Sequence, residues 1–238
     1  MISAFAKTTA ITLCVSLFGC ASAQKTSLSD ESRHKIKSIA FIDVDEPDKY
    51  FLNPGQLPGG AALYAFGALG GLILGSVEAS RADSATIEFT TVLTPMAPQL
   101  SSHWNETMGQ LLKSKGYDVT MLDHLPKKSD GKEIDCTSIS GKYDAVFISN
   151  ISAGYSIETN VEPRVVVTTK LLSSTCSETK YSDSFIYGSK ALGKLTLVDR
   201  DQEFVFPSRD ALLADPKKAK TALRTGLAKI AERGVSDL

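Results

Sequence analysis

The sequence carries almost no net charge. Its 238 residues include 26 Lys and Arg against 27 Asp and Glu, and no long basic run interrupts this balance. Nucleic-acid binding depends on a concentration of positive charge that neutralises phosphates, and this chain does not supply one. We therefore expect no nucleic acid among its partners.

Recognisable catalytic patterns are also missing. The chain contains no Gly-x-Ser-x-Gly nucleophile elbow, no phosphate-binding Gly-Lys-Ser or Gly-Lys-Thr loop and no dinucleotide fingerprint. Histidine occurs three times, at His34, His103 and His124, and none of these has a metal-ligand partner at helical spacing. The sequence predicts no catalytic residue, no metal site and no cofactor, so we do not expect an enzyme.

One polar grouping is nevertheless of interest. Asp43 comes at the end of the first expected strand, and Asp123 with His124 follows the second. These residues can meet at one edge of a sheet. Carboxylates in turns are usually solvated caps, however, and the sequence favours that interpretation over a catalytic role.

Cysteine is scarce, and one of the four cysteines has an informative position. An apolar stretch from Thr8 to Phe18, preceded by Lys7 as its only charge, leads into Leu17-Phe18-Gly19-Cys20. This run resembles the lipobox of bacterial lipoproteins, which implies a signal peptide at residues 1–19 and a diacylglycerol and an acyl chain, such as palmitate, on Cys20. The alternative is ordinary secretion, with cleavage after Ala21-Ser22-Ala23.

The other cysteines follow from this interpretation. Cys14 is lost with the signal peptide and Cys20 takes the lipid, which leaves Cys136 and Cys176 as a pair in an oxidising compartment. We predict a disulfide between them, with two separate thiols as the alternative. Zinc is disfavoured because neither cysteine belongs to a close Cys or His pair.

A single α/β (α+β) domain is expected after a lipidated polar tether at residues 20–35. The tether is Ser-rich, which is typical of flexible linkers. In the domain, residues 36–238, β-branched and aromatic runs predict one mixed sheet of about five strands, at 36–44, 117–122, 143–151, 165–172 and 180–187. Two packing helices are expected, at 98–115 and from Pro216, with Asp215 as N-cap and Gly234 as the stop. The predicted order is β-α-β-β-β-β-α.

An apolar, glycine-rich insertion interrupts this order at about residues 57–78. Residues 59–77 carry no charge, and Gly67, Gly71 and Gly75 recur at intervals of four, which would place them on one side of a helix. Small residues at this spacing let two helices approach closely. The segment is therefore interpreted as a helix that packs within the protein or against another copy, with membrane contact or an irregular loop as alternatives.

The succession of elements resembles that of small periplasmic α/β lipoproteins. The strand Ile39–Val44, the helix ending in Gly116–Val119 and the strand Tyr143–Ile148 are similar to those of the TolB N-terminal domain and of the curli-secretion lipoprotein. The resemblance implies an envelope scaffold, an assembly factor or a secretion channel. No obvious pairs of amphipathic strands are present for a membrane barrel, so a β-pore is not expected.

The prediction that follows is a lipoprotein of the bacterial cell envelope that binds other proteins as a scaffold or as an assembly or secretion accessory factor. Ala21, rather than aspartate, follows Cys20, which favours the outer membrane, facing the periplasm. Expected partners are the membrane, through the N-terminal lipid, other envelope proteins and further copies of the chain. The main alternative is a membrane-active or channel-associated oligomer built on Gly67, Gly71 and Gly75, and a secreted enzyme is third.

Overall fold

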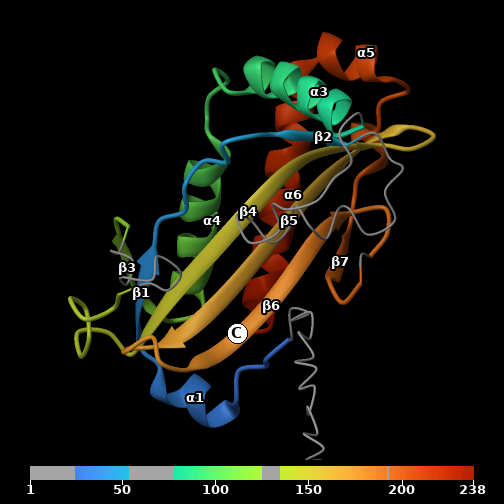
Figure 1. Ribbon diagram of the computed structural model, residues 1–238. Helices are drawn as coiled ribbons and strands as arrows, with labels where there is room; N and C mark the ends of the chain where they lie inside the picture. Colours follow the sequence, from blue (N-terminus) through green and yellow to red (C-terminus); the bar gives the residue numbers. More distant parts are fainter. Residues whose placement is uncertain (1–24, 54–77, 125–134, 192) are drawn as a thin grey trace, which may run out of the picture.

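A mixed β-sheet forms the centre of the domain, and helices cover one of its faces (Figure 1). The computed structural model describes residues 25–53, 78–124, 135–191 and 193–238. Within these ranges the sheet has seven strands in the order β3-β1-β4-β5-β6-β7, and β2 also pairs with β4. The strands are β1 (Ser38–Ile42), β2 (Phe51–Asn53), β3 (Asp118–Leu122), β4 (Ala145–Ile157), β5 (Val161–Ser173), β6 (Thr179–Gly188) and β7 (Thr196–Asp199). The helices are α1 (Asp30–Lys35), α3 (Glu78–Leu93), α4 (Leu100–Ser114), the 3-10 helix η2 (Gln202–Phe204), α5 (Arg209–Ala214) and α6 (Pro216–Ser236).

The predicted fold class is confirmed. The five predicted strands correspond to β1, β3, β4, β5 and β6, and the two predicted helices to α4 and α6. The short strands β2 and β7 and the helices α1, α3 and α5 come in addition. The prediction that the last helix ends at Gly234 is wrong, because α6 continues to Ser236.

The strands fall into two kinds of pairing. β4, β5 and β6 form an antiparallel meander, whereas β1 pairs in parallel with both β3 and β4. Strand β2 pairs in parallel with the far end of β4. Thus β1 and β2 lie one after the other along the same side of β4, and the residues between them, 43–50, leave the sheet.

The main core lies between the sheet and the helices α4 and α6. The apolar face predicted for α4 is buried at Leu100, Trp104, Met108 and Leu112, while Asp215 caps α6 by accepting the Lys218 N–H at 3.0 Å. Gly116 follows α4 with a φ of +94°, a backbone conformation that favours glycine. The helices α4 and α6 cover one face of the sheet, and a second, smaller hydrophobic cluster lies on the other face.

On that second face, a disulfide joins the predicted pair Cys136 and Cys176, whose Cα atoms are 6.0 Å apart. It closes a loop over a sequence separation of 40 residues and so stabilises the fold by about 4 kcal/mol in the loop-entropy description. Aliphatic side chains cluster with it, namely Ala40, Ile42, Ile139, Val146 and Leu172. The bond therefore links the segment before β4 to the hairpin between β5 and β6.

The N-terminal segment corrects the prediction of a flexible tether. Thr26 forms an isolated bridge with Ser182 of β6, with N–H···O distances of 2.8 and 3.0 Å in the two directions. Lys25 lies 2.8 Å from the carboxylate of Asp183, and Leu28 is buried. The part of the predicted tether that the structure describes, 25–35, is thus docked on the domain and includes α1. Its Ser-rich composition concealed contacts with residues more than 150 positions away.

Gly226 of α6 packs directly against the ring of Tyr187 in β6. A Cβ atom there would lie 2.6 Å from the Tyr187 ring, and that buried ring is held by hydrogen bonds of its hydroxyl with Asp201. We expect Gly226→Ala to destabilise the protein by roughly 1–3 kcal/mol, because the overlap outweighs the gain in helix propensity. Urea unfolding monitored by circular dichroism measures the change.

Gly234→Ala in the same helix is the matched control. An added Cβ would meet its nearest neighbour, the Phe185 ring, at an ordinary 3.5 Å. We expect this variant to be neutral or more stable by up to about 1 kcal/mol. Equal effects of the two substitutions would contradict the packing described here.

Candidate functional site

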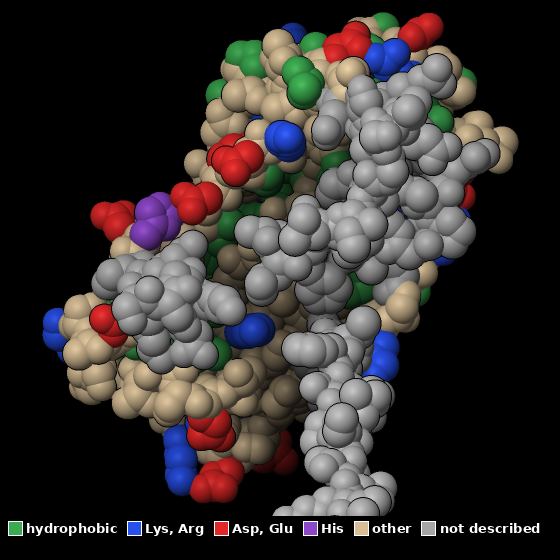
Figure 2. All heavy atoms as spheres, in the orientation of Figure 1, with side chains coloured by type: hydrophobic (Ala, Val, Ile, Leu, Met, Phe, Trp, Pro, Cys, Tyr) green, Lys and Arg blue, Asp and Glu red, His purple; other side chains and the backbone are tan. Residues whose placement is uncertain are grey.

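An open cleft lies where the chain leaves the sheet between β1 and β2. Strand β1 pairs with β4 at Ala145–Phe147, and β2 pairs with it at Gly154–Ser156. Residues 148–153 of β4, between these two pairings, have no strand partner on this side within the described residues. The cleft has a volume of about 790 Å³. Its walls are formed by Ile42, Asp43, Val44, Asp45, Glu46, Pro47, Asp48, His124, Ile148, Ser149, Asn150 and Ile151. In Figure 2, acidic side chains gather on both sides of a histidine at the margin of this face.

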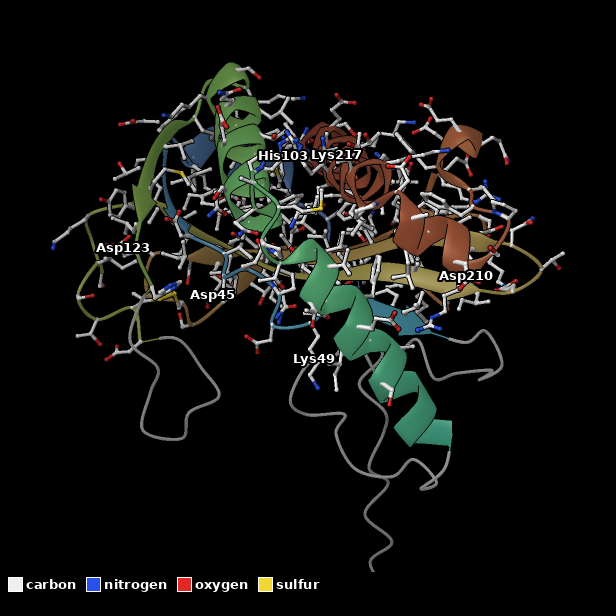
Figure 3. All side chains as sticks on the ribbon, turned by 90° about the horizontal axis from the view of Figure 1, so that it is seen from above. Asp45, Lys49, His103, Asp123, Asp210 and Lys217 are labelled. Carbon is white, nitrogen blue, oxygen red and sulfur yellow. A yellow bond between two sulfur atoms is a disulfide. The ribbon has the colours of Figure 1, made fainter. Side chains whose placement is uncertain are left out.

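The grouping of Asp43 with Asp123 and His124, considered from the sequence, is present at this cleft. The Asp43 N–H donates to the Leu122 carbonyl oxygen at 2.9 Å, which joins the ends of β1 and β3. Burial raises the pKa of the Asp43 carboxyl, and the nearby charge of Asp123 raises it further, while His124 opposes this shift. Asp45 and Asp123 lie at the same end of the sheet (Figure 3).

The rim of the cleft is open to water. The His124 Nε2 atom lies 3.1 Å from a carboxylate oxygen of Asp45, but the two side chains are 61% and 84% exposed. Such a pair contributes little to stability because water screens it. The exposed carboxylate of Asp45 therefore remains available to a basic group that approaches from outside.

Beneath the rim, Glu46 connects the cleft to the helices. One carboxylate oxygen of Glu46 accepts the backbone N–H of Ser101 at 2.8 Å, in the first turn of α4, and the other accepts the hydroxyl of Tyr50. Gln99, the N-cap residue of α4, makes no capping hydrogen bond with its own side chain. Glu46 thus supplies the negative charge that a helix N-terminus favours.

Lys220 of α6 completes this network and is only 3% exposed. Its ammonium group donates to the Tyr50 hydroxyl at 2.5 Å and to Gln99 at 3.4 Å, and it lies 3.5 Å from Glu46 and 4.5 Å from the centre of the Tyr50 ring. The three ammonium protons therefore have three acceptors. Buried charges are stable only with such partners.

The pKa values of Glu46 and Lys220 reflect both their burial and their contacts with each other. Burial by itself would raise the pKa of Glu46, but the hydrogen bonds from Ser101, Tyr50 and Leu100 together lower it. Burial lowers the pKa of Lys220, and the charge of Glu46 opposes that shift. Through these contacts the network ties the chain from Asp43 to Tyr50 to the helices α4 and α6.

Sequence reasoning missed Glu46, Tyr50 and Lys220. A signal was available for Lys220, since it lies within the apolar stripe of α6 between Ala219 and Ala222. A lysine in a buried stripe requires an acidic or polar partner. Nothing in the sequence identifies that partner, because Glu46 is 174 residues away.

Not all of the predicted site residues belong to the described part of the chain. Cys20, Gly67, Gly71 and Gly75 lie outside the described residues. In the part of the chain that is described, no set of three His, Cys, Asp or Glu side chains is arranged to hold a metal ion. None of the helices in that part has the length and apolar character needed to cross a membrane.

No protein-family model matches the chain, and no curated protein matches its sequence. The solved structures that overlap with most of the chain at low similarity include the following three. The PelC dodecamer from Paraburkholderia phytofirmans is 11% identical with a TM-score of 0.34 and covers 88% of this chain and 96% of that chain. A protein from Xanthomonas campestris is 9% identical with a TM-score of 0.38, covering 84% and 81%. Lipoprotein GNA1162 from Neisseria meningitidis is 14% identical with a TM-score of 0.28, covering 66% and 87%. At these values the similarities assign neither a family nor a function.

The network predicts a strong energetic coupling between Glu46 and Lys220. Lys220→Met should destabilise the protein by roughly 1–3 kcal/mol, and Glu46→Gln by more, since it leaves a buried ammonium without a counter-charge. The double variant should cost less than the sum, and urea unfolding of all four proteins measures this difference. Lys217→Met, an exposed position of α6, is the matched control and should be neutral within about 0.5 kcal/mol.

Acid should weaken the same network. The pKa of Glu46 is lowered on folding from its ordinary value of 4.5, so its contribution is complete above that pH and is lost as the pH falls through the lower folded value. The Glu46→Gln protein should therefore lose less stability than the wild type between neutral pH and the acid limb. Parallel curves for the two proteins would contradict this role for Glu46.

Proposed function

We propose that this chain is a lipid-anchored protein of the bacterial cell envelope whose domain binds other proteins. The observation that carries the proposal is the use of cysteine: Cys20 ends a lipobox-like run, and Cys136 and Cys176 are joined in a disulfide. Both features belong to a protein that works outside the cytosol. The finer location we propose is the outer membrane, facing the periplasm.

Binding rather than catalysis is the proposed activity. Support comes from Lys220, the most deeply buried lysine of the site, whose protons are held by three acceptors. The carboxylates of Asp45 and Asp48 at the rim of the cleft are exposed to solvent and suit recognition of a basic surface.

The outer side of β3 is the proposed contact. Asp118 donates its N–H to Lys37 and Leu122 accepts the N–H of Asp43, so the even-numbered residues of β3 bond to β1. The backbone groups of Val119 and Met121 therefore point away from the sheet, because successive residues of a strand alternate. Within the described residues no strand pairs with this side. A partner strand that adds here would run beside β3 toward Asp123 and His124, which follow its end, and the carboxylate of Asp123 favours basic residues at that end of the partner.

Anchoring is tested by substitution of the two N-terminal cysteines. We expect a clickable palmitate analogue to label the wild type and Cys14→Ala but not Cys20→Ala, and the Cys20→Ala protein to leave the membrane fraction. A wild-type protein that takes up no label, and whose N-terminus by mass spectrometry is an unmodified Gln24, would show ordinary secretion instead.

The binding surface is tested by a photo-crosslinking amino acid placed at Met121 in intact cells. Met121 is 38% exposed on β3, and Ile87, 58% exposed on α3, is the control position. We expect cross-links to another envelope protein from position 121 and not from position 87. Cross-links from 121 only to further copies of this chain, together with liposome leakage that depends on Gly67, Gly71 and Gly75, would favour the membrane-active oligomer.

A further inference from the structure

The docked N-terminal segment fixes where the chain enters the domain. Lys25 is held between Asp183, which is 3% exposed, at 2.8 Å and Asp237 at 3.0 Å. Next to it, Thr26 pairs with Ser182 through two hydrogen bonds, and Leu28 is 5% exposed. We call this region, with α1 and the last turn of α6, the N-terminal pole of the domain. Its fixed contacts mean that any pull from the preceding residues acts at this place.

The distance from the lipid to this pole is limited by covalent geometry. Five residues lead from Cys20 to Lys25. A fully extended chain spans at most about 3.6 Å per residue, so Lys25 lies within about 18 Å of the lipid attachment point. A relaxed flexible linker of this length spans only about 12 Å.

The domain is longer than this linker. Thr26 is level with Ser182 and so with Lys170 of β5, whereas Asn53 is level with Ser156 and so with Glu162. Eight residues of β5 separate the two levels, which is about 27 Å at the rise of a strand. Figure 1 shows α1 and the C-terminus at one end of the sheet and α3 and α5 at the other.

We propose that the N-terminal pole faces the bilayer surface and that the opposite pole, with α3, α5 and the hairpin between β4 and β5, points away from it. This inference rests on the proposed lipidation of Cys20. Turning the opposite pole toward the same bilayer would place Lys25 about 27 Å from it, beyond the roughly 18 Å that the linker can span.

The chemistry of the pole fits a headgroup surface rather than the hydrocarbon. The exposed residues of α1 are charged or polar, and charges of opposite sign are paired there, as in Lys35 with Glu31 at 2.6 Å. Nearby, Arg233 pairs with Asp237 at 2.5 Å. A surface of this kind lies at the headgroups without inserting, so linker length rather than penetration sets the orientation.

The test uses the full lipidated chain, purified from membranes and reconstituted into vesicles that contain a lipid with a nitroxide on its headgroup. Lys35→Cys in α1 and Thr159→Cys in the hairpin after β4 each add one free thiol for a fluorophore, since Cys136 and Cys176 are paired. We expect loss of fluorescence at position 35 and none at position 159. Equal loss at both positions, or greater loss at 159, would overturn the proposal.

A ten-residue Gly-Ser insertion between Gln24 and Lys25 tests the role of the linker. It lengthens the linker from five to fifteen residues and its relaxed span from about 12 to about 21 Å, so quenching at position 35 should fall while the protein stays bound to the vesicles. Quenching that survives the insertion would show that the pole binds the bilayer without help from the linker and would overturn this mechanism.

Failure of the proposed function would look different. A chain without lipid at Cys20 would not float with the vesicles in a density gradient, whichever label it carries. A protein that floats but shows the reverse quenching pattern would keep its anchor and lose only the proposed orientation.

Discussion

The carboxylate of Glu46 is the contact on which the arrangement of this domain depends. It binds the first turn of α4, accepts a hydrogen bond from Tyr50 just before β2 and neutralises Lys220 of α6. Each of these groups is partly or fully removed from water, so each would be costly without the others. Through this one side chain, the segment that leaves the sheet between β1 and β2 is tied to both helices of the main core. The shape of the cleft and the packing of the helical layer are therefore set together.

The parts of the fold that could be predicted from sequence are those with local signals. The β-branched runs identify β4, β5 and β6, and the spacing of Trp104, Met108 and Leu112 identifies α4. Residues 152–157 of β4 could not be predicted, because this part of the strand, which includes Ser152, Gly154 and Ser156, forms through its pairing with β5. The docking of residues 25–35 was missed for the same reason, since Lys25 finds its partners at Asp183 and Asp237.

In the candidate site, too, only the features with a local sequence signal could be predicted. Asp43, Asp123 and His124 could be placed together because neighbouring parallel strands end at the same edge of a sheet. The ion pair of Glu46 with Lys220 could not, because it joins a turn to a helix across most of the chain. Pairing of charges over such distances is decided by the tertiary fold, and a single sequence contains no local pattern for it.

The bridge between Thr26 and Ser182 has a mechanical consequence. If the chain is anchored through Cys20, any drag on the domain is transmitted to two backbone hydrogen bonds, the ion pair of Lys25 with Asp183 and the buried side chain of Leu28. These contacts would yield before the central strands, which are paired along ten residues or more. Their rupture would free α1 and lengthen the connection to the anchor while the sheet stays folded. Under tension the domain would then move outward from the membrane in one step, as a reversible extension rather than as unfolding.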